Sequence, residues 1–215
     1  MRCLSYSLGF RSLMTVDTMF KTLPTFLAAV LAACTLLLAG CNDAPETAAQ
    51  KAAAAAPISV EAIAAEAKGF VVGSQMSKRT VYIFFDAQCP HCAMLWESAK
   101  PLKSQAKFVW IPVGLLNAAS TAQGATLLAA GDPIAAMDEH ETSMRAGRGG
   151  ISAASSIDPQ KDAVVKNTAL LTRLGFTAIP TIVGTHAQTG AVVSQEGALP
   201  TAALAGLLGL QVPGQ

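Results

Sequence analysis

Two cysteines, Cys89 and Cys92, are separated by Pro90 and His91 and follow an apolar run at residues 81–85. The segment that begins at Pro90 has a helical pattern, which places the first cysteine at a helix N-terminus. Free N–H groups and the helix dipole favour a thiolate there and lower its pKa, and a protonated His91 adds positive charge. The second thiol can then close a disulfide or resolve a mixed one. The motif therefore predicts thiol–disulfide exchange, with Cys89 as the accessible attacking thiol and Cys92 as the more buried resolving thiol.

Two simpler interpretations of the cysteine pair are weaker. Half of a zinc site would need two more ligands, and the three histidines, His91, His140 and His186, show no ligand-like spacing. A purely structural disulfide within one helical turn would constrain the unfolded chain little. We therefore expect no metal, and no cofactor beyond a redox-active disulfide between Cys89 and Cys92.

Composition sets the class of protein. The chain has 215 residues, of which 52% are hydrophobic and 13% are charged, enough to bury one ordinary core. Its formal net charge is +1 and it has no basic run, so nucleic acid is not an expected partner. We therefore expect one folded domain, and the N-terminus is more informative than the total charge.

The N-terminus has the features of a bacterial lipoprotein signal. A short basic region precedes an apolar run at residues 23–40, which ends in Leu-Ala-Gly directly before Cys41. This ending resembles the lipobox, in which the cysteine is lipidated and becomes the mature N-terminus. We expect residues 1–40 to be the signal peptide, with Met14 or Met19 as alternative true starts. An uncleaved anchor helix is the competing interpretation, because the apolar run is just long enough to span a bilayer.

Once the signal is removed and Cys41 is lipidated, only Cys89 and Cys92 remain, so the exported domain has no structural disulfide framework. Residues 41–57 begin with the lipidated cysteine and are rich in alanine, which predicts a tether from the membrane. Residues 58–79 predict a linker helix and an entry segment to the domain.

The remaining residues, 80–210, alternate strand and helix patterns. A continuous apolar strand is expected at 80–85, of the type that is buried on both faces. The other expected elements are a helix from Pro90 ended by Pro101, a strand at 107–113 with Pro112 near an edge, helices at 117–131, 132–144 and 158–174, a loop at 147–150, a hairpin at 181–184 and 191–194, and a closing helix at 200–208.

Several apolar side chains of the expected helices are assigned to packing. Met94, Leu95 and Trp96 are expected to face inward. Met137 and Met144, at helical spacing, are expected to lie in the core rather than to bind a cofactor.

Three titratable side chains outside the motif are expected to be structural. Asp86, three residues before Cys89, is interpreted as a solvent-facing or capping carboxylate, with proton relay to Cys92 as the alternative. His140 lies among charged neighbours and is expected on a solvated helix face, and His186 is expected in the hairpin turn.

Three stretches together resemble a known family. These are Tyr-Ile-Phe-Phe-Asp-Ala-Gln-Cys-Pro-His-Cys at 82–92, Trp-Ile-Pro-Val-Gly at 110–114, and the alanine-rich helix that ends in Gly-Asp-Pro at 131–133. They are similar to the thioredoxin superfamily, and within it to the exported Dsb-type DsbC and DsbG group, closest to its DsbG branch. The resemblance covers residues 70–210. It implies an α/β thioredoxin fold with a helical block at 117–150 inserted between the second strand and a cis-proline loop.

The resemblance also implies a substrate-binding loop. In this superfamily a cis proline lies beside the two cysteines, and the preceding residue pairs through its backbone with an extended peptide. Pro180 takes this role by resemblance, and Ile179 would give the backbone contacts. An ordinary trans proline at the start of a strand is the alternative.

Two features of the chain bear on oligomeric state and redox direction. The DsbC and DsbG group carries a separate N-terminal dimerisation domain, and the roughly 40 residues after Cys41 are too few for it, so we expect a monomer. Pro90 and His91 resemble the dipeptide of the oxidising Dsb proteins, which stabilises the thiolate. In contrast, Ile179-Pro180-Thr181 resembles the reducing thioredoxins, so the direction stays open.

The leading hypothesis is thiol:disulfide interchange in the periplasm by an enzyme tethered through Cys41. It would oxidise or isomerise exported proteins that carry cysteines, and a membrane redox partner would reset its disulfide. The first alternative is a periplasmic thiol reductase, serving sulfenic acids or cytochrome c maturation. The second is a chaperone-like, peptide-binding lipoprotein whose cysteine pair is incidental.

Overall fold

The structure is a computed structural model, and it describes residues 58–212 and 214. The predicted signal peptide at 1–40, the lipidated Cys41 and the tether at 41–57 therefore lie outside the described residues. Among the helices that are described, none combines the length and the apolar character needed to cross a bilayer.

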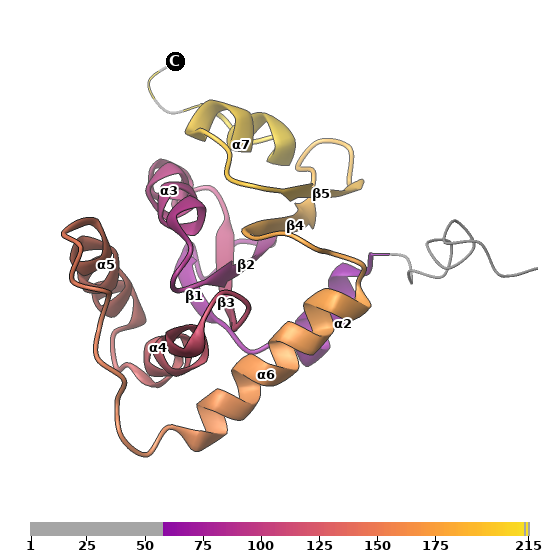
Figure 1. Cartoon of the computed structure of the whole chain (residues 1–215). Helices are drawn as coiled ribbons and strands as arrows, with labels where there is room; N and C mark the ends of the chain where they lie inside the picture. Colours follow the sequence, from indigo (N-terminus) through magenta and orange to yellow (C-terminus); the bar gives the residue numbers. More distant parts are fainter. Residues whose placement is uncertain (1–57, 213, 215) are drawn as a thin grey trace, which may run out of the picture. The chain divides into compact units, whose positions relative to one another are not determined.

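A mixed five-stranded sheet forms the centre of the domain (Figure 1). Its strand order is β1-β3-β2-β4-β5, in which β2 and β3 are parallel and the other neighbours are antiparallel. The strands are β1 at Phe70–Gly73, β2 at Thr80–Asp86, β3 at Lys107–Val113, β4 at Thr181–Thr185 and β5 at Val192–Glu196.

Strand β2 lies in the middle of the sheet because its side chains are apolar on both faces. Val81 to Phe85 are all buried, and β2 pairs with β3 on one side and β4 on the other. On β3, the pairing with β1 ends at Trp110, two residues before Pro112. Pro112 therefore pairs with β2 on one side and has no β1 partner on the other. The predicted strand and the predicted edge position of Pro112 are both confirmed.

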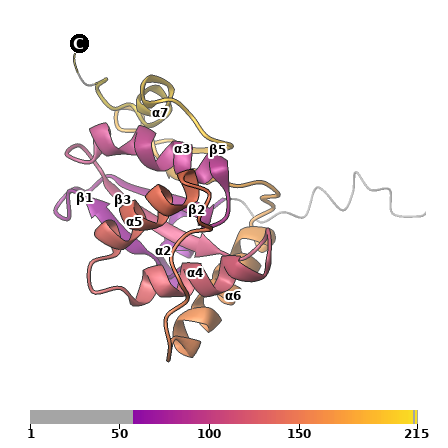
Figure 2. The ribbon, with the colours of Figure 1, turned by 60° about the vertical axis from the view of Figure 1, so that its left-hand side comes forward.

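Helices cover both faces of this sheet, as Figures 1 and 2 show from two directions. Leu95 of α3 and Leu204 of α7 belong to the core cluster on one face, and Ile63 of α2 and Leu170 of α6 belong to the cluster on the other. The helices are α2 at Val60–Glu66, α3 at Pro90–Ala99 with a 3-10 turn at Lys100–Leu102, α4 at Ala118–Ala129, α5 at Pro133–Arg145, α6 at Asp158–Arg173 and α7 at Thr201–Leu208.

Local capping signals explain where the helices begin. Ser59 accepts a hydrogen bond from Ala62 N at the start of α2. Asn117 forms a capping box with Ser120 at the start of α4, and Asp132 accepts from two N–H groups at the start of α5. The order of elements and the insertion of α4 and α5 before the β4–β5 hairpin are those of the predicted thioredoxin fold.

Candidate active site

The two motif cysteines lie in the turn that joins β2 to α3. Cys89 is the N-cap residue of α3, and its carbonyl oxygen accepts hydrogen bonds from Cys92 N at 3.0 Å and Ala93 N at 3.2 Å. Pro90 occupies the first helical turn, where no N–H donor is needed. Both cysteines are free thiols, with 6% of Cys89 and 0% of Cys92 exposed. Cys89 is therefore only slightly more accessible than its partner, less than the motif predicts.

The two thiols have opposite electrostatic environments. The pKa of Cys89 is lowered from 9.0 to about 6, chiefly because the Cys92 thiol donates a hydrogen bond to its thiolate. The N–H groups of Cys92 and His91 and the charge of His91 lower this pKa further, against the opposing effect of burial. Burial raises the pKa of Cys92 strongly. The pKa of Cys89 is thus lowered, as predicted, but the largest cause of this shift is Cys92 rather than His91 or the helix N-terminus.

The loop before β4 brings a backbone carbonyl beside the first cysteine. The Ile179–Pro180 peptide bond is cis, and the carbonyl oxygen of Ile179 lies 3.9 Å from Cys89 Sγ. The Glu196 carboxylate accepts hydrogen bonds from the N–H groups of Thr177 and Ala178, each at 2.7 Å. The loop is thus held from β5, and the predicted cis geometry of the bond is confirmed.

Asp86 is buried at the end of β2, so the solvent-facing interpretation of this residue is wrong. Its carboxylate accepts hydrogen bonds from Leu115 N at 2.7 Å, Leu116 N at 3.0 Å and Gln88 N at 2.9 Å. These N–H groups belong to two separate turns, the one before Cys89 and the one after β3, so the carboxylate joins the two turns. The capping interpretation therefore holds, and proton relay to Cys92 stays a prediction.

His140 is fully buried against the active-site turn, so the predicted solvated position is wrong. Its Nε2–H donates to the carbonyl of Ala87 at 2.6 Å, because Nδ1 accepts from Ile151 N at 3.2 Å and so carries no proton. Burial lowers the pKa of His140, which favours this neutral form. A side chain at Gly150, whose φ is +90°, would come within 2.4 Å of the ring, so glycine is required there.

A second polar contact joins the same turn to the helical block. Gln88 Nε2 donates to Gln123 Oε1 at 2.5 Å and to the Gly149 carbonyl at 3.2 Å. Gln123 Nε2 in turn donates to the carbonyls of Gly149 and Ile151. The inserted helices and the loop after α5 therefore hold the residues directly before Cys89 through buried side chains.

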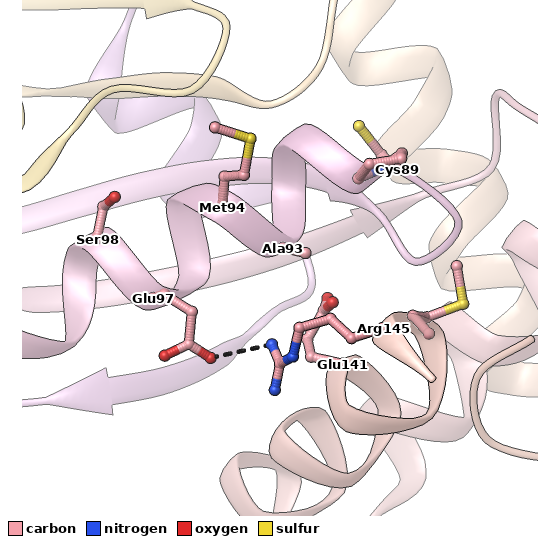
Figure 3. A pocket seen from close by; sticks show the side chains of 9 residues that line it. Cys89, Ala93, Met94, Glu97, Ser98, Glu141 and Arg145 are labelled. Atoms are coloured by element: carbon pink, nitrogen blue, oxygen red, sulfur yellow. Dashed lines mark hydrogen bonds and ion pairs between the residues drawn. The ribbon is translucent and has the colours of Figure 1, made fainter. Parts of the chain in front are cut away.

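A pocket of about 510 Å³ begins at Cys89 and runs between α3 and α5 (Figure 3). Glu141 lines it with only 2% exposure, although the sequence did not single this residue out. The spacing of Met137 and Met144 could have indicated that Glu141 is buried, because His140 and Glu141 fall between the two methionines on the same helical face. The pocket is lined by Cys89, Pro90, Ala93, Met94, Glu97, Ser98, Glu141, Met144 and Arg145.

The predicted packing of the helix side chains is only partly right. Leu95 and Trp96 are buried, but Met94 is 59% exposed and lines the pocket, so its predicted inward position is wrong. Met137 is in the core as predicted, whereas Met144 is half-buried at the pocket wall. Met94 and Met144 face the pocket from opposite helices, so the flexible apolar side chains of this region border the site.

No metal-binding cluster of three or more His, Cys, Asp or Glu side chains is found within residues 58–212. His91 is exposed beside the cysteines, whereas His140 is buried and His186 accepts hydrogen bonds from Gln188 N and Thr189 N in the hairpin turn. The structure therefore gives no grouping of the three histidines as metal ligands within these residues.

The sheet order, the Cys-x-x-Cys turn and the adjacent cis proline define a thioredoxin-like protein. Residues 70–211 match the thioredoxin-like domain family, and the chain belongs to that family. The predicted superfamily and fold are thereby confirmed.

The similarity to particular proteins points to the Dsb group. The thiol:disulfide interchange protein DsbG of Pseudomonas aeruginosa is 34% identical over 146 residues, which are 64% of this chain and 54% of the relative. DsbG of Escherichia coli is 29% identical over 105 residues, 47% of this chain and 42% of that relative. The chain thus spans about half the length of the curated relatives it matches. The predicted resemblance to the DsbG branch is confirmed over this part.

A solved structure supports the fold independently of sequence. The catalytic domain of Proteus mirabilis ScsC has a TM-score of 0.53 with this chain at 16% identity. The match covers 69% of this chain and 96% of that domain. At this identity the likeness concerns the fold alone.

Proposed function

We propose that this protein catalyses thiol:disulfide interchange, oxidising or isomerising disulfides in exported proteins through a redox-active disulfide between Cys89 and Cys92. The observation that carries the proposal is the position of Cys89. It caps α3, its thiolate is stabilised, and its sulfur lies 3.9 Å from the Ile179 carbonyl. A nucleophile and a buried second thiol therefore share one turn, and a backbone acceptor for substrate lies beside them in the cis-proline loop.

In oxidation, a substrate thiolate attacks the Cys89 sulfur of the enzyme disulfide. The Cys89–Cys92 bond breaks, and Cys92 leaves as a thiolate that takes up a proton, as its raised pKa favours. A second substrate thiolate then attacks the substrate sulfur of the mixed disulfide, and Cys89 leaves as a thiolate. In isomerisation, the Cys89 thiolate instead attacks a substrate disulfide, which forms a mixed disulfide and frees one substrate thiolate. A different substrate thiolate then attacks the substrate sulfur of the mixed disulfide, forms a new substrate disulfide and releases Cys89 as a thiolate.

The binding roles follow from the same geometry. The backbone of Ile179, next to the cis Pro180, would pair with an extended substrate segment in the manner of an added strand. His91 is exposed beside the pair, and Pro90 starts the helix. A membrane redox partner would return the cysteine pair to its disulfide or dithiol form after each cycle.

The stabilised Cys89 thiolate bears on the redox direction of the cysteine pair. A lowered Cys89 pKa stabilises the reduced form, which makes the disulfide a stronger oxidant. This supports oxidation or isomerisation over the reductase alternative. The tripeptide Ile179-Pro180-Thr181, which resembles that of the reducing thioredoxins, favours the reductase instead.

The deciding experiment is the reduction potential of the Cys89–Cys92 pair, measured by equilibration with glutathione. We expect a value nearer to about −120 mV, typical of DsbA, than to about −270 mV, typical of thioredoxin. A value near the thioredoxin potential would replace the proposal with the periplasmic reductase.

Variants of the pair separate an enzyme from a chaperone-like protein. Cys89→Ala should abolish turnover of a disulfide-bonded client, and Cys92→Ser should accumulate the mixed disulfide at Cys89. Full retention of activity towards unfolded clients by Cys89→Ala would support the chaperone-like alternative instead.

We further propose that the chain is exported to the periplasm, lipidated at Cys41 and active as a monomer. The support is the lipobox-like sequence before Cys41 and the periplasmic setting in which Dsb-type exchange takes place. Lipid labelling in cells should mark the wild type and not Cys41→Ala, and equal labelling of both would overturn the anchor. Light scattering of the detergent-free domain should give the monomer mass.

A further inference from the structure

We propose that the pocket between α3 and α5 is a specificity subsite that binds a lysine or arginine side chain of the substrate, close to the substrate cysteine. The inference rests on the proposed interchange function and names the class of substrate it prefers. It is carried by three features of the pocket: its position next to Cys89 with apolar walls, its unpaired Glu141 carboxyl, and the pairing of the other charged side chains around it.

The first feature is position. Cys89 and Pro90 line one end of the pocket, which then follows α3 away from the active-site turn. A substrate joined to Cys89 Sγ by a disulfide therefore has its neighbouring residues at the mouth of the pocket. The walls facing the pocket from the two helices include Ala93, Met94 and Met144. Such walls suit the aliphatic stem of a long side chain.

The second feature is the Glu141 carboxyl. Glu141 is 2% exposed, and among the described residues its carboxylate has no ion pair and no side-chain hydrogen bond. In Figure 3 it points from α5 towards α3, into the space between the helices. A buried carboxyl without a partner is costly unless a cation or a donor reaches it. The ammonium or guanidinium group of a substrate would supply that partner.

The third feature is how the other charges near the pocket are paired. Glu97 accepts from Arg145 at 3.4 Å and from Lys100 at 3.0 Å, and Lys100 also contacts Asp138 at 2.7 Å. Arg145 also lines the pocket, but its ion pair is with Glu97 and not with Glu141. The acid that remains for a ligand is Glu141.

Protonation should control this subsite. Burial raises the pKa of Glu141 to about 7, with Glu97 and the Cys89 thiolate acting in the same direction and Arg145 and Lys100 against it. The carboxylate that attracts a cation is therefore present above about pH 7 and lost below it. A substrate with a cationic side chain should therefore bind better than a neutral one only above about pH 7.

The test compares seven-residue peptides that contain one cysteine and carry either lysine or norleucine at one position. The substituted position is moved in turn through the two residues before and the two after the cysteine. Each peptide is supplied as its mixed disulfide with glutathione and equilibrated with the full chain carrying Cys92→Ser. The Cys89 thiolate attacks the peptide sulfur and releases glutathione as a thiolate, and the mixed disulfide between the peptide and Cys89 is quantified by mass spectrometry. Norleucine keeps the aliphatic stem and removes the charge, so the lysine-to-norleucine ratio isolates the contribution of the peptide's positive charge.

At pH 8 we expect a ratio of about ten at one or more positions, a typical size for a partly buried charge-assisted contact. The ratio should fall towards one at pH 6, and also in the additional variant Glu141→Gln at pH 8. Glu139→Gln is the matched control, because Glu139 is exposed on the same helix and does not line the pocket.

A ratio near one at every position at pH 8, or a preference that survives Glu141→Gln, would overturn the subsite. The pH dependence in the otherwise unchanged chain provides a readout that does not depend on how well Glu141→Gln folds. If even the norleucine peptides form no mixed disulfide with Cys89, the failure lies in the proposed interchange function and not in the subsite.

Discussion

The turn that carries Cys89 lies between two regions of unlike construction. On one side, the cis-proline loop presents the backbone carbonyl of Ile179 to the sulfur, and the Glu196 carboxylate holds the loop through two N–H groups. On the other side, α5 and the loop after it hold the turn through buried side chains, His140 above all.

This difference indicates how stability and recognition are divided. A backbone carbonyl beside the sulfur can bind almost any extended peptide, because every substrate residue except proline carries the same N–H group. Buried side chains on the α5 side are specific to this sequence, and each depends on its exact partner. We therefore expect changes at α5 to alter folding stability or substrate choice, and changes at the cis-proline loop to alter exchange with peptides in general.

The largest effect on stability is expected from His140→Leu. This change leaves the Ala87 carbonyl and the Ile151 N–H without partners in a buried place, which should cost about 2–4 kcal/mol. Urea unfolding at pH 7.5 measures the loss. Glu139→Gln, on the exposed neighbour in the same helix, should change stability by less than about 0.5 kcal/mol.

A loss for His140→Leu below about 1 kcal/mol would mean that the turn is held by the Gln88 and Gln123 contacts alone. The two polar links would then be redundant, and the α5 side would not be the stability-bearing region.

The opposite side is tested by Glu196→Ala. Removal of the carboxylate frees the Thr177 and Ala178 N–H groups, but both residues are exposed and water can replace the acceptor. We expect a stability loss of about 1–2 kcal/mol and a roughly tenfold slower exchange with peptides, since the Ile179 carbonyl is then less well placed.

Exchange with glutathione, which is too short to pair along the loop, should fall less than exchange with peptides in the Glu196→Ala variant. Glu196→Gln keeps one acceptor oxygen and should lie between the wild type and Glu196→Ala. Equal losses for glutathione and peptides would show that the loop does not position peptide backbone.

The elements that could be predicted from the sequence are those that depend on local signals. The helices near 117–131, 132–144 and 158–174 were predicted closely because their starts are marked by local signals, Asn117, Asp132 and the Asp-Pro pair at 158–159. Strand β2 was predicted because an apolar run buried on both faces is readable without knowledge of its partners. The motif cysteines and the proline loop could be predicted for the same reason, because each is recognised from a short stretch of sequence.

The α5 side could not be predicted as well, because its burial depends on contacts distant in sequence. Every position of the run 138–141 is charged or titratable, so the hydrophobic pattern alone does not say which face is buried. That face is decided by Ala87, 53 residues away from His140, and by the glycine-rich loop that closes over the ring. Met94 was misassigned for a related reason, since an apolar side chain at a pocket wall has the same pattern as one in the core.

A pH series extends the comparison within α5 itself, where two adjacent groups respond in opposite directions. The pKa of His140 is lowered from 6.5, so the unfolded chain binds its proton more readily, and this group makes the protein less stable as the pH falls below about 6.5. The pKa of Glu141 is raised from 4.5 to about 7, so this group makes the protein more stable as the pH falls from about 7 to about 4.5. Unfolding of the wild type from pH 8 to pH 5 should thus change little, whereas Glu141→Gln should reveal the full loss of stability due to His140 at acid pH.

The smallest expected effect is a gain. Glu141→Gln removes a carboxylate that is buried without a partner, and it should stabilise the protein by about 1 kcal/mol at pH 8 and by almost nothing at pH 5, where the glutamate is already neutral. Urea unfolding at the two pH values measures the gain, with Glu139→Gln as the control that should show none at either pH. A stability gain together with a lost preference for lysine peptides would mean that the α5 side keeps a destabilising acid for recognition. An equal loss of stability at both pH values would instead assign Glu141 to packing, and the division between the two sides of Cys89 would be one of structure alone.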